Sequence, residues 1–171
     1  MKSTSLLIVG CVAAVGFAQL AIAKDKAKAS APAAKPEAVT IAPQDVKWGD
    51  PPPVLPKGAQ LAVMHGDPSK KGSFALRFKM PDGYAIAPHW HTNDEELTIL
   101  TGTFQLGMGD KVDQAAMQSL APGAYHFLPG RMHHYAMAKG ETVIELHGMG
   151  PFDLHYINPA DDPSKSAALT K

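Results

Sequence analysis

Two histidines and a glutamate near the middle of the chain have the types and the spacing of metal ligands. His89 and His91 are two residues apart, and Glu95 follows four residues later. On a β-strand, residues two apart leave the same face, roughly 6–7 Å apart along the chain, so both imidazoles can turn onto one ion. Glu95 has the same parity, after residues 92–94 (Thr-Asn-Asp), which have the composition of a turn or bulge. Two imidazoles and a carboxylate suit a divalent first-row metal.

Short segments of alternating hydrophobicity surround these residues. The clearest is 74–80, in which Phe74, Leu76 and Phe78 alternate with small or charged residues. This pattern predicts a strand with one buried and one wet face. Similar strands are expected over 60–64, 84–91, 96–100, 103–108, 124–128, 134–138, 142–147 and 152–157, with an irregular or short helical segment over 110–118. Many short strands broken by glycine and proline indicate an all-β sandwich or barrel.

The spacing of the three candidate ligands resembles the first motif of the cupin superfamily. That motif is Gly83, five residues, His89-x-His91, three residues, Glu95, six residues and Gly102. The resemblance extends over about residues 44–160. It implies an all-β cupin double-stranded β-helix, a jelly-roll barrel, as a single domain over 39–160.

A later segment is similar to the second cupin motif. It runs from Gly123 through Pro129-Gly130 and implies a fourth metal ligand at His134. Arg131 stands where the family has a glycine, and Ala138 stands where it has an asparagine. Since adjacent strand residues face opposite ways, His133 is expected to point away from the ion.

The resemblance implies one divalent transition metal, Fe, Mn, Ni, Cu or Zn, bound by His89, His91, Glu95 and His134. Such a set leaves about two positions of a six-coordinate ion for substrate, dioxygen or water. Ala85 and Ala87 are expected beside the first two histidines, with Ala136 and Ala138 beside His134, so that the cavity stays open.

The leading hypothesis is a metal-dependent enzyme, a dioxygenase-like oxidoreductase acting on a small organic substrate, in which Glu95 is also a catalytic residue. The alternative is a metal-containing cupin that binds or senses a small molecule without turnover, because fold does not fix function. The roles of Arg131, His147 and Glu145 stay open: Arg131 could meet an anionic ligand, and the other two could face the cavity or the surface.

The N-terminus predicts export. Lys2, the apolar run from Leu6 to Ala21 and the small residues at 21–23 fit a signal peptide over residues 1–23. A membrane anchor and lipidation at Cys11 are the alternatives. Cleavage would leave a mature chain without cysteine in the periplasm or outside the cell, with no stable membrane insertion.

Composition bounds the remaining possibilities. The chain has 171 residues, of which 45% are apolar, and its 16 basic residues match its 16 acidic ones. This balance does not suggest a basic surface for nucleic acid, and none is expected as a partner. Residues 24–38, rich in Lys, Ala and Pro, predict a disordered linker, and 161–171 a polar tail. The expected partner is a small molecule, and a homodimer stays open.

Overall fold

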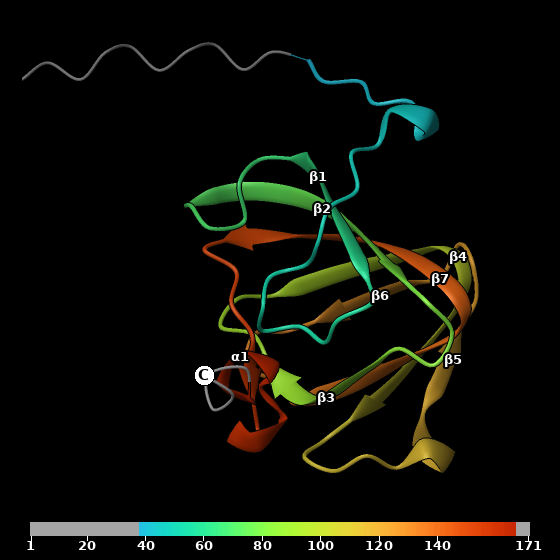
Figure 1. The fold of residues 1–171 in the computed structure, drawn as a ribbon, viewed down its shortest axis with the longest axis vertical. Coiled ribbons are helices and arrows are strands. Elements are labelled where there is room, and N and C mark those ends of the chain that lie inside the picture. The colour runs from blue at the N-terminus through green and yellow to red at the C-terminus, as the bar shows by residue number, and fades with distance from the viewer. Residues whose placement is uncertain (1–37, 167–171) are drawn as a thin grey trace, which may run out of the picture. The chain divides into compact units, whose positions relative to one another are not determined.

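The structure, a computed structural model, describes residues 38–166. Its elements are η1 (Pro43–Asp45), β1 (Gln60–His65), β2 (Gly72–Met80), β3 (Ala85–Trp90), β4 (Glu95–Met108), η2 (Gln114–Ala116), β5 (Gln118–Leu120), β6 (Tyr125–Leu128), β7 (His134–Gly150), β8 (His155–Tyr156), η3 (Pro159–Asp161) and α1 (Pro163–Ser166). Strands dominate, as Figure 1 shows.

The two longest strands, β4 and β7, run through both halves of the barrel. They pair antiparallel from Glu95 opposite Gly148 to Met108 opposite His134. The second half of β7 also pairs with β2, and its first half with β3. The first half of β4 pairs with β6 and its second half with β5. The eight strands therefore form one continuous sheet that folds into two curved halves, β1-β2-β7-β4-β6 and β8-β3-β7-β4-β5, and the predicted all-β jelly roll is confirmed (Figure 1).

The β4–β7 pair bends where its register shifts, between Ile99 and Thr103. Gly102 adopts φ +75° there, and a Cβ on it would collide with the backbone oxygen of Glu141 and with Thr142. Thr142 is fully buried. Its hydroxyl accepts a hydrogen bond from the backbone N–H of Thr103 and donates one to the backbone carbonyl of Thr103. Glycine thus lets β4 bend without ending. The expectation of separate strands over 96–100 and 103–108 is wrong, as is that of separate strands over 134–138 and 142–147.

The core follows the predicted alternation. Phe74, Leu76 and Phe78 are buried, whereas Ala75 and Arg77 between them are only partly covered. Burial of each large apolar side chain contributes roughly 1.5–3 kcal/mol to stability.

The C-terminal part differs from its prediction. A strand was expected over 152–157, but only His155–Tyr156 form β8, and residues 152–154 line the interior cavity instead. The expected polar tail begins with η3 and α1, which follow one another from Pro159 to Ser166. The predicted signal peptide and, apart from residue 38, the predicted linker lie outside the described residues. Within 38–166 no helix has the length and apolar character needed to span a membrane.

Candidate metal centre

His89 and His91 come from the end of β3 and the residue that follows it. Their strand pairs with β7, where His89 lies opposite His134, but its register shifts between Ile86 and His89. This irregularity turns Ile86 and His89 toward the same cavity although they are three residues apart. The prediction that Ala85 and Ala87 line the cavity is therefore wrong: Ala85 is exposed, and neither residue is part of the wall. Ala136 does line it, beside His134.

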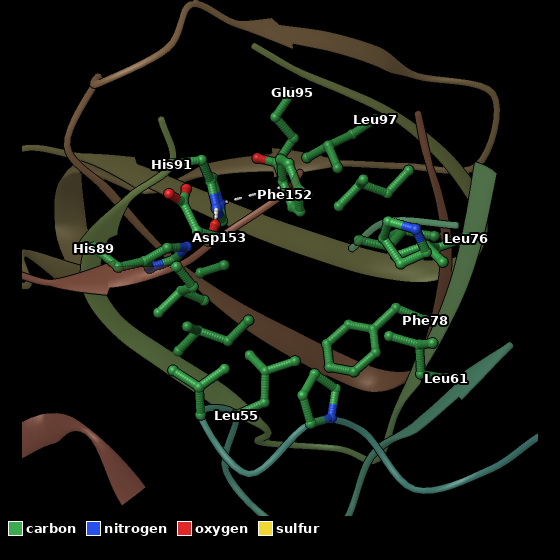
Figure 2. A pocket seen from close by; sticks show the side chains of 18 of the residues that line it. Leu55, Leu61, Leu76, Phe78, His89, His91, Glu95, Leu97, Phe152 and Asp153 are labelled. Atoms are coloured by element: carbon green, nitrogen blue, oxygen red, sulfur yellow. Dashed lines mark hydrogen bonds and ion pairs between the residues drawn. The ribbon is translucent and has the colours of Figure 1, made fainter. Parts of the chain in front are cut away.

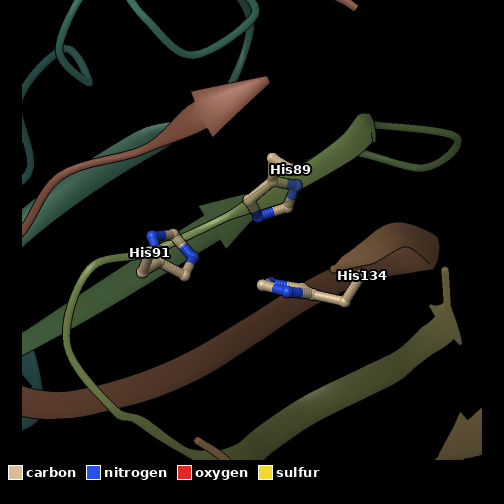
Figure 3. A group of neighbouring side chains, drawn as sticks. All are labelled: His89, His91 and His134. Carbon is tan, nitrogen blue, oxygen red and sulfur yellow. The ribbon is translucent and has the colours of Figure 1, made fainter. Parts of the chain in front are cut away.

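The three histidines form one compact group. A ring nitrogen from each of His89, His91 and His134 lies within 4.8 Å of the other two. The ring centroids of His89 and His134 are 4.1 Å apart, and His91 lies 5.0 and 5.2 Å from them. All three side chains are buried, and Figure 3 shows them facing one another from two neighbouring strands. This histidine triad could hold a metal ion.

Backbone carbonyls fix the orientation of each ring. Nδ1 of His89 donates to Ala87 O at 2.7 Å, and Nδ1 of His134 donates to Met132 O at 3.0 Å. Nδ1 of His91 donates to Asp153 O. Because a carbonyl can only accept, each ring carries its proton on Nδ1 and presents the Nε2 lone pair inward. This is the tautomer that ligates a metal through Nε2.

One buried atom supports the fit of a cation directly. Nε2 of His91 is the sole buried side-chain nitrogen or oxygen without a hydrogen-bond partner in the stretch that the structure describes. Such atoms are rare because desolvation without a partner is costly. A metal ion among the three Nε2 atoms would satisfy it, so the residues present fit the group.

Glu95 lies beside the triad. Its carboxyl oxygens are 3.6 Å from Nε2 of His91 and 3.5 Å from Nε2 of His134. Burial raises the pKa of Glu95 to about 8, and burial lowers the pKa of His91 to about 4. Burial, then the neighbouring His134 and His91 rings, lowers the pKa of His89 well below its usual value. A divalent cation among these neutral imidazoles would favour the ionised form of the Glu95 carboxyl group beside them.

The second motif keeps its turn despite its departure from the family. Arg131 adopts φ +67°, the left-handed conformation that a glycine would provide, and its N–H donates to His91 O at 2.8 Å. Its guanidinium lies over the ring of Trp90, 5.6 Å from the centroid, and not in the cavity. His133 points away from the triad, as predicted, and its Nδ1 is 2.6 Å from Asp110 Oδ1.

Glu145 and His147 face away from the cavity. Nε of Arg77 binds Glu145 at 2.8 Å, and Nε2 of His147 lies 3.2 Å from the other carboxylate oxygen. Their neighbours in β7, Ile144 and Leu146, face the cavity instead. The sequence left open whether Glu145 and His147 face the cavity or the surface. The alternation of side chains along β7 turns both away from the cavity.

Two residues that support the triad could not be identified from sequence patterns. Phe152 stacks on His91 with ring centroids 4.4 Å apart at 19°. Asp153 accepts from the backbone N–H of Thr92 at 2.7 Å and from its hydroxyl at 2.6 Å. Burial by itself would raise the pKa of Asp153, but its hydrogen bonds from Thr92 and His155 lower it to about 2. No spacing rule links residues 152–153 to a motif some 60 residues earlier.

The triad forms one side of a cavity of about 440 Å³. Figure 2 shows His89, His91 and Glu95 on one side, and Leu61, Leu76 and Phe78 on the other. Most of the wall is aliphatic or aromatic. This size and this combination of an apolar wall with a few convergent polar groups are typical of small-molecule sites.

The barrel has the jelly-roll fold of cupin structures, and its three histidines are close enough together to share one metal ion. The chain belongs to the family described as "Domain of unknown function (DUF4437)", whose model matches residues 16–154. No curated protein matches the chain in sequence.

Solved structures share the fold at low sequence identity. The polyketide cyclase RemF from Streptomyces resistomycificus is 17% identical, with a TM-score of 0.61 over 78% of this chain and 95% of its own. An acetylacetone dioxygenase from Acinetobacter johnsonii is 19% identical, with a TM-score of 0.57 over 83% and 97%. KdgF from a Halomonas species is 20% identical, with a TM-score of 0.51 over 67% and 96%. At such identities the similarity establishes the fold alone.

Proposed function

We propose that this protein is an exported, metal-dependent oxidoreductase of the dioxygenase type that acts on a small organic substrate. The observation that carries the proposal is the convergence of three inward Nε2 atoms and a buried carboxyl group on the wall of an apolar cavity. The similarity in fold to a protein named acetylacetone dioxygenase is consistent with this reaction class.

His89, His91 and His134 would hold one divalent metal, Fe, Mn, Ni, Cu or Zn, with Glu95 as the fourth protein ligand. A bound ion of this kind supplies a Lewis acid and, for the redox-active metals, a centre for electron transfer with dioxygen. The apolar wall excludes water from the reacting atoms, which strengthens electrostatic interactions there.

Glu95 would also act on protons. Its carboxylate lies on the cavity wall beside two inward Nε2 atoms, where the acidic group of a substrate would be bound. Transfer of a proton from a substrate hydroxyl or acidic C–H to this carboxylate leaves the substrate as its anion and Glu95 neutral.

The test loads metal-free protein with each of the five metals and follows dioxygen uptake with a panel of phenols, flavonols and dicarbonyl compounds. We expect uptake with one metal and one compound class. His134→Ala should abolish it, whereas His133→Ala, the matched change at the neighbouring position, should not. Tight, metal-dependent binding of a compound without turnover on any metal would instead support a non-catalytic binding or sensor protein.

A further inference from the structure

The wall of the cavity has a chemistry that selects among ligands. Beyond the triad and Glu95 it is built mainly from side chains such as Phe78, Ile86, Leu97 and Leu106. Within residues 38–166, no lysine or arginine lines it. Away from the triad and Glu95, a ligand in this cavity therefore meets mostly hydrocarbon.

The two other polar residues of the wall are already occupied. The hydroxyl of Ser69 donates to Asp67 at 2.6 Å. The carboxylate of Asp153 accepts from Thr92 and lies 2.9 Å from Nε2 of His155. The triad and Glu95 are thus the main place at which polar atoms of a ligand can bind.

A proline-rich segment before the first strand forms part of the opposite wall. Within residues 51–56, here called the proline segment, Pro52, Val54 and Leu55 line the cavity. Figure 2 shows Leu55 across the cavity from Glu95. Prolines cannot donate to a sheet, and tyrosines hold the segment instead. The Tyr156 hydroxyl donates to Val54 O at 2.9 Å, and the Tyr84 hydroxyl donates to Pro56 O at 2.7 Å.

We propose that this cavity binds a neutral, largely apolar molecule whose oxygen atoms are gathered at one end, and that the apolar end packs against the proline segment. The inference rests on the proposed function in that the ligand occupies the same site. Its oxygen end lies at the triad and Glu95. An ionised group at the other end would be buried among hydrocarbon without a partner, which disfavours its binding.

Binding to zinc-loaded protein tests the inference without turnover, because Zn²⁺ has no redox chemistry. The probes are propylcatechol and the dihydroxyphenylpropanoate of equal length, in which a carboxylate replaces the terminal methyl group. Calorimetry should give an affinity at least about tenfold higher for propylcatechol. Zinc content is measured before and after, so that extraction of the metal is recognised. Equal or tighter binding of the carboxylate would overturn the inference.

Variants of the proline segment test the wall itself. Leu55→Lys supplies a cation to the far end and should reduce the preference for propylcatechol at least about tenfold. Val63→Lys adds the same charge at a position that is 50% exposed on β1 and should leave the preference unchanged. An equal effect of both variants would contradict the assignment of the wall.

Leu55→Ala serves if Leu55→Lys does not fold. It should raise the affinity for hexylcatechol relative to propylcatechol, and an unchanged ratio would also contradict the assignment. The two proposals fail separately. If propylcatechol binds more tightly than the carboxylate probe but no dioxygen is consumed, only the proposed function is overturned. If dioxygen is consumed but the carboxylate probe binds equally or more tightly, only this inference is overturned.

Discussion

The Nδ1–H of His91 donates a hydrogen bond to the backbone carbonyl of Asp153, 62 residues further along the chain. The Asp153 carboxylate in turn binds the backbone N–H and hydroxyl of Thr92, the residue after His91. One residue of the C-terminal segment therefore fixes both the ring and the backbone at this position of the triad.

Asp153→Ala should weaken metal binding by about 10–100-fold, the range typical of groups that orient a metal ligand. The variant removes both bonds to Thr92, so the carbonyl that holds the His91 ring is no longer fixed. Competition with a chromophoric chelator measures the affinity. Asp162→Ala is the matched control, because Asp162 makes similar local bonds to Ser164 away from the triad. Equal affinities of the two variants would refute this role of Asp153.

His134→Ala should lower metal affinity by more than about 100-fold, since loss of a ligand exceeds loss of the group that orients it. His133→Ala should have little effect, because this side chain binds Asp110 outside the triad. Metal content of the purified variants by mass spectrometry decides between them. The assignment of the ligand is wrong if the His133 variant is the one that loses its metal.

Metal binding should release about one proton at pH 7, because burial keeps Glu95 protonated up to a pKa of about 8 and ligation needs the carboxylate. Apparent affinity should therefore rise with pH, up to about tenfold per unit, until about pH 8. The histidines add little, since burial holds the pKa of His91 at about 4. Calorimetry in buffers of different ionisation enthalpy counts the protons. The same release from Glu95→Gln would show that another group supplies them.

The mature protein should begin at Lys24 and be found outside the cytoplasm, since Lys2, the apolar run and the small residues at 21–23 fit a cleaved signal peptide. Mass spectrometry of the active protein from its native host determines the first residue. An intact Met1, or a lipid on Cys11, would contradict the prediction.

Local geometry was enough to predict much of the fold and part of the site. The period of two along a strand placed Phe74, Leu76 and Phe78 in the core. The alternation of side chains along a strand, with the cupin spacing, predicted that His89 and His91 lie near Glu95 and that His134 and His133 point in different directions. Each of these follows from the positions of residues near one another in sequence, which a motif records. Their binding of a metal stays a prediction.

The tertiary structure decided the rest. The register shift before His89, which replaces Ala85 and Ala87 with Ile86 in the cavity, arises from pairing of β3 with β7 and cannot be seen in β3 alone. The support of His91 by residues 152–153 and the wall formed by the proline segment join parts of the chain far apart in sequence. Such contacts depend on how the sheets close around the cavity, and no local pattern specifies them.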